Sequence, residues 1–309
     1  MQRIRVGTAA WADKELIESG LYFPPGCASP EERLRFYAAE FPLVEIDTSY
    51  YAIPQTSSAR QWAERTPADF LFDIKAFRLF TGHGTDAKVL PPSVRAALPA
   101  SLLAQQFYYR DIPDELRSAL WRDYVGVLKV LQAAGKLGVV LFQFPPWFPR
   151  SVESHRHIEE VRARLPDFDL AVEFRNESWL NAEARARTLA FLSALRISLM
   201  NVDEPQGFAS SVPPTSEVTG AYGLVRFHGR NAETWEKKGL TAASARFDYL
   251  YRPGELQSWV TPIFQMAEEA EKGVHVIINT NHLDQGPQNA RILAAMLGTG
   301  LAGPPQRLL

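Results

Sequence analysis

Short runs of β-branched and aromatic residues recur eight times along this chain, and longer segments with helical spacing separate them. Strands that alternate with helices form a parallel sheet. Eight such repeats within 309 residues predict an α/β fold, a closed (β/α)8 barrel (TIM barrel) with loop insertions at the C-terminal face of its strands. An open doubly wound sheet is less favoured, because no Gly-rich turn follows the first strand. The predicted strands are Ile4–Thr8, Val44–Thr48, Phe70–Lys75, Gly138–Gln143, Leu170–Phe174, Ile197–Asn201, Gly223–His228 and Val274–Asn279.

The segments between these strands are expected to form the outer ring of helices. No linker or low-complexity tract divides the chain, so residues 1–309 are predicted to form a single barrel domain. The predicted helices are Pro30–Glu40, Ser57–Arg65, Asp114–Ala134, Val152–Arg164, Ala182–Leu195, Glu255–Lys272 and Pro287–Leu297.

Three segments depart from the simple repeat. Phe77–Arg110 is an insertion after the third strand, and it could close as a lid or pack as a fixed wall. Residues 203–253 supply irregular loops around the seventh strand, with no full-length helix predicted in Asp203–Ala221 and a further extension at Asn231–Pro253. All three leave the carboxyl ends of strands, where barrel enzymes build their sites, and long loops of this kind are usually functional.

The charge balance of the chain limits its partners. The formal net charge is −2, without the basic excess that nucleic-acid binding proteins usually show, so nucleic acid is not the favoured partner. The one feature in its favour is a basic loop after the seventh strand. That loop holds Arg230, Lys237, Lys238 and Arg246.

The single cysteine and the chain ends indicate the compartment. Because Cys27 is the single cysteine, the chain cannot form an internal disulfide. No predicted base lies beside Cys27, so a structural or incidental role is favoured over that of a nucleophile. Met1 leads directly into the first strand without the features of a signal peptide, and no apolar run has the length of a membrane span. A cytoplasmic location without membrane contact is therefore predicted.

Charged residues alternate with apolar residues at the ends of several predicted strands. In Val44-Glu45-Ile46-Asp47 the two carboxylates share one face, because side chains two positions apart on a strand point the same way. The same alternation gives a set of polar residues that should converge on the barrel axis. A closed structural network of ion pairs is the competing interpretation, since buried charges require partners. The set is Glu45, Asp47, Asp73, Lys75, Gln143, Glu173, Arg175, Arg226, His228, Asn279 and Asn281.

These residue types favour acid/base and electrostatic catalysis. Glu173 is the predicted general base or acid, with Lys75 and His228 as catalytic partners, because burial brings carboxyl and amine pKa values toward neutrality. Arg175, Arg226 and Arg230 are predicted to clamp an anionic group of a small polar or phosphorylated substrate. The other predicted substrate-binding residues are Glu45, Asp47, Gln143, Asn279 and Asn281, with Trp11, Tyr51 and Trp179 as aromatic surfaces at the rim.

Two alternatives use the same residues. No cofactor is required by the sequence, but Glu45, Asp47, Glu173 and His228 are oxygen and imidazole groups that could bind Mg²⁺, Mn²⁺ or Zn²⁺ in a hydrolase or isomerase. No H-E-x-x-H motif supports a metal, and the four basic residues already balance the acids. The second alternative is a protein that binds an anionic metabolite without catalysis.

Seven ordered motifs resemble those of the YecE-like family, a domain of unknown function numbered 72. They are "VGTAAW", "VEIDTSYYAIP", "FLFDIKAF", "LFQFPPWF", "AVEFRNESW", "VRFHGR" and "NTNHLDQGPQNA". The resemblance covers nearly the whole chain and implies a TIM barrel without assigning an activity. Carried over position by position, the family pattern falls on Glu45, Tyr51, Lys75, Gln143, Glu173, Arg175, Trp179, Arg226, His228, Arg230 and Asn279. This sequence departs from the pattern at Ala9 and Ala10, at Phe77, and at Asp47, where Asn is usual.

Overall fold

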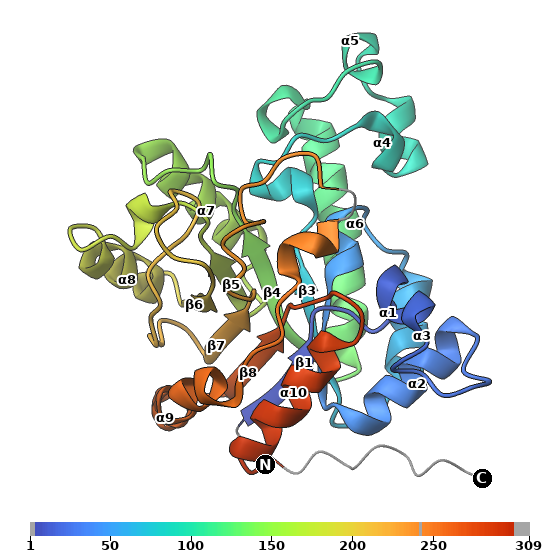
Figure 1. Cartoon of the computed structure of the whole chain (residues 1–309). Helices are drawn as coiled ribbons and strands as arrows, with labels where there is room; N and C mark the ends of the chain where they lie inside the picture. The colour runs from blue at the N-terminus through green and yellow to red at the C-terminus, as the bar shows by residue number, and fades with distance from the viewer. Residues whose placement is uncertain (1–3, 241–242, 300–309) are drawn as a thin grey trace.

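The computed structural model describes residues 4–240 and 243–299 and contains a closed barrel of parallel strands in sequence order (Figure 1). The first and last strands close the barrel, with Ile4 beside Val274 and Thr8 beside Ile278. The predicted (β/α)8 fold is confirmed. The strands are β1 (Ile4–Thr8), β2 (Leu43–Ile46), β3 (Leu71–Lys75), β4 (Leu137–Gln143), β5 (Leu170–Glu173), β6 (Ile197–Asp203), β7 (Tyr222–Phe227) and β8 (Gly273–Ile278).

The observed strand ends differ from the predicted ends by at most two residues. The largest functional difference is at β2, which ends at Ile46 rather than at Thr48. Asp47–Tyr50 turns into a short 3-10 helix, η1, so that Asp47 lies above the strand instead of within it. This turn places Asp47 at the barrel mouth while Glu45 remains inside the barrel.

Helices surround the barrel, and their starts follow local capping chemistry. Helix α2 begins with a capping box, in which Ser29 and Glu32 satisfy each other's backbone N–H groups and Pro30 takes the first helical position. Predicted and observed bounds agree for α2 and α7. The six-residue α1 was not predicted, because so short a helix carries little periodicity. The helices are α1 (Lys14–Ser19), α2 (Pro30–Glu40), α3 (Thr56–Glu64), α4 (Pro92–Ala96), α5 (Ala100–Leu103), α6 (Asp114–Ala133), α7 (Val152–Arg164), α8 (Arg185–Ala194), α9 (Pro253–Glu269) and α10 (Gln285–Met296). Within the described ranges, none of them has the length and apolar character needed to cross a membrane.

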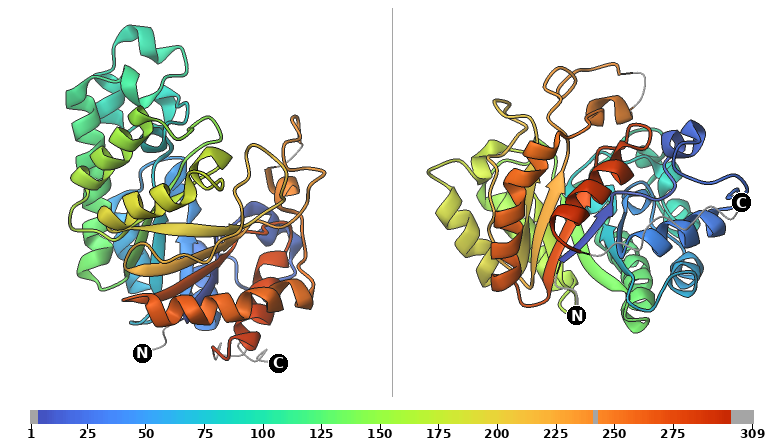
Figure 2. Two further views of the ribbon diagram at one scale, coloured as in Figure 1. Left: turned by 90° about the vertical axis from the view of Figure 1, so that its left-hand side faces the viewer. Right: turned by 60° about the horizontal axis from the view of Figure 1, so that its bottom comes forward.

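The insertion after β3 packs against the outer helices at its base. Phe80 stacks on Trp121 of α6 with ring centres 3.8 Å apart, and the Trp121 indole donates to the Tyr109 hydroxyl. His157 of α7 donates to the Phe80 carbonyl oxygen. Helices α4 and α5 continue from this base and stand beyond the end of the barrel (Figures 1 and 2). The base of the insertion is therefore a fixed wall of the mouth.

The loop between β6 and β7 follows its prediction, since residues 204–221, all of which are described, contain no helix. The side chain of Asn201 on β6 holds this loop: its amide oxygen accepts from Thr215 Oγ1 and from the Glu217 backbone N–H. Both bonds keep the chain close to the barrel in place of a helix.

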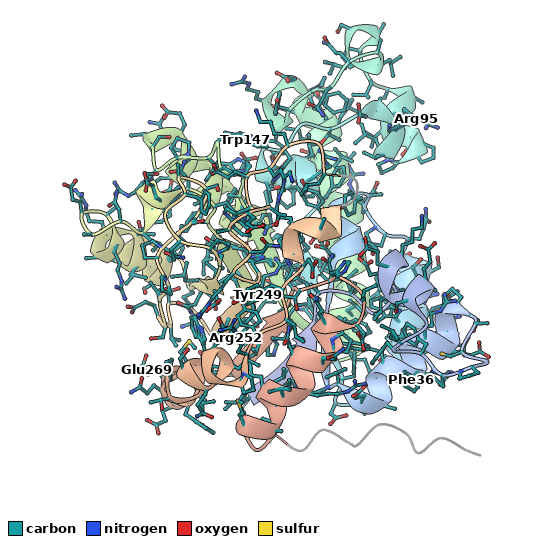
Figure 3. The ribbon with its side chains drawn as sticks, viewed as in Figure 1. Phe36, Arg95, Trp147, Tyr249, Arg252 and Glu269 are labelled. Atoms are coloured by element: carbon teal, nitrogen blue, oxygen red, sulfur yellow. The ribbon has the colours of Figure 1, made fainter. Side chains whose placement is uncertain are left out.

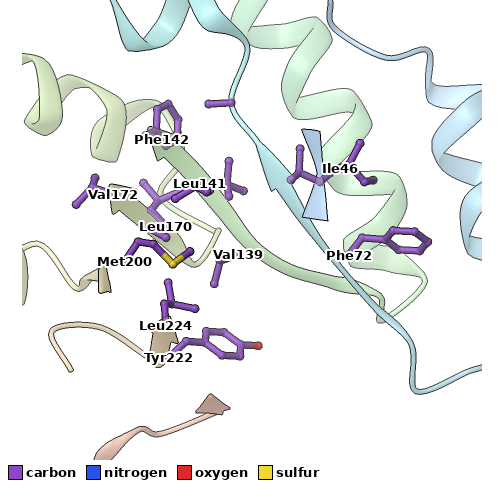
Figure 4. Packing of buried hydrophobic residues seen from close by; sticks show 14 of the residues in the cluster. Ile46, Phe72, Val139, Leu141, Phe142, Leu170, Val172, Met200, Tyr222 and Leu224 are labelled. Atoms are coloured by element: carbon purple, nitrogen blue, oxygen red, sulfur yellow. The ribbon is translucent and has the colours of Figure 1, made fainter. Parts of the chain in front are cut away.

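Apolar and polar side chains divide between the two faces of the strands. Apolar residues such as Ile46, Phe72 and Phe142 are fully buried in the layer between strands and helices (Figure 4). Inside the barrel, Asp73 pairs with His275 at 3.0 Å and also accepts from the Val139 backbone N–H. Asp73 is thus part of a buried structural pair, as the closed-network interpretation predicts for this residue.

A Gly138→Ala substitution tests how tightly this pair is packed. A Cβ atom at Gly138 would lie 2.1 Å from Asp73 Oδ1 and 3.0 Å from His275 Cε1. We expect the free energy of unfolding to fall by about 1–3 kcal/mol, because overpacking forces the pair apart. Gly126→Ala in α6 is the control: its Cβ would meet only Thr56 Cγ2, at 3.6 Å, so a gain of up to about 1 kcal/mol is expected from helix propensity. Urea denaturation of both variants measures the difference, and equal stabilities would contradict the prediction.

Candidate functional site

The barrel interior near the mouth holds an inner network, which we define as Glu45, Gln143, Glu173, Arg226, His228 and Asn279. Arg226 is its centre. Its guanidinium donates to Glu45 Oε1 at 2.7 Å and to Glu173 Oε2 at 3.1 Å, and all three side chains are essentially unexposed. The alternation of residues on β2, β5 and β7 therefore brings together the charges that the sequence predicted to converge.

The tautomer of His228 follows from its two neighbours. Asn279 accepts a hydrogen bond from Arg226 with its amide oxygen, so its amide nitrogen is left to donate to His228 Nδ1 at 3.0 Å. The other ring nitrogen, Nε2, then carries the proton and donates to Glu173 Oε1 at 2.9 Å. Burial, together with Arg175 and Arg226, lowers the pKa of His228 to about 4 despite Glu173. The imidazole is therefore neutral near pH 7.

Glu173 is saturated with donors. In addition to Arg226 and His228, the Gln143 amide donates to Glu173 Oε1 at 2.6 Å, and Arg175 lies 3.7 Å from the same oxygen. Burial opposes the charge on Glu173, but His228, Arg226 and Arg175 more than offset it and hold the pKa well below its ordinary value. A carboxylate that is this strongly held is a poor proton acceptor at neutral pH. This geometry does not support the predicted general base role of Glu173 and suits a positioning role.

Glu45 has fewer hydrogen-bond donors around its carboxyl group than Glu173 has. One of its oxygens accepts from Arg226, whereas Oε2 is buried and has no hydrogen-bond partner among the described residues. Burial outweighs the attraction of Arg226 and Lys75, and it raises the pKa of Glu45 to about 7. Glu45 is thus the carboxyl group of the inner network that can exchange a proton near neutral pH.

A cavity of about 450 Å³ opens beside Glu45 at the barrel mouth. Its walls come from the β1–α1 loop, α1, β2, η1, α3 and the loop after β8. Five of the predicted site residues line it, namely Trp11, Glu45, Asp47, Tyr51 and Asn281. The lining residues that sequence reasoning missed include Asp13 and Trp62. Their positions carry no alternation of polar and apolar residues that distinguishes them from a helix start or an ordinary packing residue.

Lys75 lies above the inner network and is paired. Its ammonium is 2.7 Å from Asp47 Oδ1 and 4.9 Å from the centre of the Tyr50 ring. Burial raises the pKa of Asp47, but the positive charges of Lys75 and Arg226 more than offset this, so the pKa of Asp47 is lowered. The pair therefore places an ionised carboxylate at the edge of the cavity.

Arg175 and Glu204 form a second buried pair on the other side of Glu173. The Arg175 guanidinium lies 4.4 Å from the Trp235 ring centre and 3.5 Å from Glu204 Oε2. Burial outweighs Arg175 and raises the pKa of Glu204 to about 8. Glu204 was missed in the sequence, although its place directly after β6 is the kind of strand end where barrel sites lie. A cavity of about 340 Å³ opens beside it.

Arg230 anchors the loop after β7. Its guanidinium donates to both oxygens of Asp203, at 2.9 and 2.6 Å. Asp203 also accepts from the Tyr251 hydroxyl and the Trp259 indole, each at 2.7 Å. Arg175, Arg226 and Arg230 are therefore all paired with carboxylates of this chain, and the predicted anion clamp is not supported by their geometry.

Trp179 does not lie at the rim. Its side chain is 0% exposed and stacks on Phe174 with ring centres 4.2 Å apart, and its indole N–H donates to the Phe148 carbonyl oxygen. Phe174 faces away from the barrel interior, so the tryptophan stacked on it belongs to the outer apolar layer. The prediction that Trp179 stacks on a substrate is wrong. An exposed tryptophan near the mouth is instead Trp147, which contacts His83 and the Gly82 carbonyl oxygen of the insertion (Figure 3).

The predicted metal ligands do not form a cage. Arg226 lies between Glu45 and Glu173, and the Nε2 atom of His228 is occupied by Glu173. In the part of the chain that the structure describes, no group of three or more His, Cys, Asp or Glu side chains is arranged to hold a metal ion. The arrangement of the donors thus does not fit the divalent-metal alternative.

Fold and site together define a TIM barrel with a network of paired charges beneath a mouth cavity. A family model described as "Protein of unknown function DUF72" matches residues 5–308, and the chain belongs to this family. It is 30% identical over 309 residues to the UPF0759 protein YunF of Bacillus subtilis, with 99% of each chain covered. The resemblance to the YecE-like family is confirmed.

Solved structures show the same fold. A DUF72 family protein of Enterococcus faecalis is 26% identical, with 99% of both chains covered and a TM-score of 0.78. A DUF72 family protein of Thermotoga maritima is 27% identical, with 96% of this chain and 100% of the other covered and a TM-score of 0.71.

The raised pKa values of Glu45 and Glu204 predict a pH dependence. Carboxyl ¹³C NMR of protein labelled at glutamate should show midpoints near pH 7 and 8, which disappear in Glu45→Gln and Glu204→Gln respectively. Folded Glu45 keeps a proton that the unfolded chain loses from about pH 4.5 upward, so stability should fall as the pH rises from there to about 7. Absence of any glutamate titration above pH 6 would contradict this.

Proposed function

We propose that this protein is an enzyme of the hydrolase, lyase or isomerase type, which transfers protons to and from a small polar substrate in the cavity at the barrel mouth. The observation that carries the proposal is the state of Glu45: this residue lines the cavity, one of its oxygens has no hydrogen-bond partner among the described residues, and the pKa of its carboxyl group is raised to about 7. A group with this pKa is present in both protonation states near neutral pH and can act as acid or base.

The remaining residues have supporting roles in this proposal. Glu45 accepts a proton from the bound substrate in one step and returns a proton in the next, so the carboxyl group ends as it began. Arg226 holds the other oxygen of Glu45 and stabilises its charged form. Glu173 and His228 position Arg226, and Lys75 keeps Asp47 ionised at the cavity edge. Trp11 and Tyr51 provide surface for the substrate.

A binding screen followed by a conversion assay tests this function. Small polar compounds that change tryptophan fluorescence of the protein would be incubated with it in D₂O and followed by NMR for conversion or deuterium uptake. We expect turnover to fall at least about 100-fold in Glu45→Gln, the size of a general acid/base contribution, while ligand affinity changes little. Gln at this position keeps an acceptor for Arg226, so the fold should be retained, as thermal unfolding can verify.

The same experiment separates the alternative. Ligands that bind at the mouth but show neither conversion nor exchange would favour a non-catalytic binding protein and overturn the enzyme proposal. Turnover that is retained in Glu45→Gln but lost in Glu173→Gln would indicate that Glu173, rather than Glu45, is the general acid or base.

A further inference from the structure

The cavity beside Glu45 has an excess of negative charge. Five of its lining residues are carboxylic acids, and of the described residues that line it only Lys14 is a basic residue. The Lys14 side chain is 83% exposed, and its ammonium lies 3.7 Å from Glu18 Oε1. The lining acids are Asp13, Glu15, Glu18, Glu45 and Asp47. Glu15 and Asp47 have partners in His282 and Lys75. Glu45 is paired with Arg226, but through Oε1 alone. Within the described residues, Asp13 is therefore the least compensated of the five acids.

The pKa of Asp13 reflects its burial and the neighbouring carboxylates. Its side chain caps α1 by accepting from the Glu15 backbone N–H. Burial, and then the neighbouring charges of Glu15 and Asp47, raise the pKa of Asp13 despite that hydrogen bond. A positive group in the cavity would relieve the repulsion, whereas a phosphate or carboxylate would add to it.

Two residues of the lining, Glu45 and Asn281, each have an acceptor atom that lacks a hydrogen-bond donor. Glu45 Oε2 and Asn281 Oδ1 are both shielded from solvent and have no hydrogen-bond partner among the described residues. Glu45 is 0% exposed, so the missing bond is costly unless a ligand supplies a donor. An ammonium or guanidinium group carries several N–H donors and no acceptor, which matches a site with free acceptors.

The aromatic lining suits the same ligand. Trp11 and Trp62 meet edge to face, with ring centres 6.0 Å apart, and Tyr51 is 53% exposed at the outer edge. Aromatic faces attract cations and also bury the carbon chain of an amine. A sugar would use the rings as well, but its hydroxyl groups need donors and acceptors together, and acceptors dominate this lining.

Resting on the proposed function, we propose that the substrate is a small organic cation, with an ammonium or guanidinium group against Glu45, Asp13 and Asn281 and its carbon chain along Trp11 and Trp62. The proposal deepens the assignment of the mouth cavity, because it replaces a generic polar substrate by an amine or guanidine. It also replaces the anionic substrate that the arginines suggested in the sequence.

Calorimetric titration of the full chain at pH 7 with agmatine, glucose and glycerol 1-phosphate tests this inference. We expect agmatine to bind at least tenfold more tightly than the other two. Asp13→Asn should weaken agmatine binding at least tenfold, because asparagine still caps the helix but carries no charge. The matched control is Glu268→Gln, which removes one exposed carboxylate on α9 that does not line the cavity and should change affinity less than twofold.

The outcomes separate this inference from the proposed function. Preferred binding of glucose or glycerol 1-phosphate, or equal agmatine affinity in Asp13→Asn and the unmodified protein, would overturn the cationic substrate. Glu45-dependent turnover of a neutral or anionic compound would support the enzyme proposal and contradict only the inference that the substrate is a cation. Agmatine binding that depends on Asp13, without turnover of any amine, would support the cation site and count against the enzyme.

Discussion

Arg226→Met is expected to lower the free energy of unfolding by about 3–5 kcal/mol, because it leaves two buried carboxylates without their shared cation. Arg226 contacts Glu45 at 2.7 Å and Glu173 at 3.1 Å, and all three side chains are at most 1% exposed. Methionine replaces the apolar stem of the side chain but not the guanidinium, so the loss reports mainly on the missing charge. Chemical denaturation at pH 7 measures the effect.

Two further variants show whether the charges are responsible. Arg226→Met combined with Glu45→Gln and Glu173→Gln should recover most of the lost stability, since no uncompensated charge remains inside. Arg196→Met removes an arginine from an exposed pair with Glu271 and should cost no more than about 1 kcal/mol. If Arg226→Met is no more destabilising than Arg196→Met, the inner network is not the buried ion cluster described above.

Trp179→Ala is expected to destabilise the protein by about 3–5 kcal/mol without weakening ligand binding at the mouth. The indole is fully buried, stacks on Phe174 and Phe148, and donates a hydrogen bond to the Phe148 carbonyl oxygen. Truncation leaves a large cavity and an unsatisfied carbonyl group in the outer apolar layer. Denaturation and ligand titration of the same variant separate the two readouts.

Trp11→Ala provides the opposite test. Trp11 lines the mouth cavity and is only partly buried, so its truncation should weaken ligand affinity at least tenfold and cost less stability than Trp179→Ala. Loss of ligand binding in Trp179→Ala at a temperature where the variant is folded would restore the rim role predicted from the sequence.

Much of the barrel can be predicted from local patterns. Each strand is a short run with a turn or helix start on either side, and the alternation in segments such as Val172-Glu173-Phe174-Arg175 shows which side chains share a face. The same alternation, taken one step further, places Phe174 outside the barrel. The outward position of Phe174 is therefore predictable from the sequence. Its contact with Trp179 is not, so the burial of Trp179 could not be predicted.

The convergence of Glu45, Glu173 and Arg226 on one axis followed from their positions in three strands, because all strands of a closed parallel barrel end at the same mouth. Their chemical roles depended on contacts between segments far apart in the chain: Arg226 is 181 residues from Glu45 and 53 from Glu173. The local sequence does not show how many hydrogen-bond donors surround Glu45 and how many surround Glu173. Three hydrogen-bond donors and the nearby Arg175 keep Glu173 ionised, whereas a single arginine donates to Glu45 and leaves its carboxyl group able to titrate. Only the folded barrel sets this division, because burial and neighbouring charge act through space.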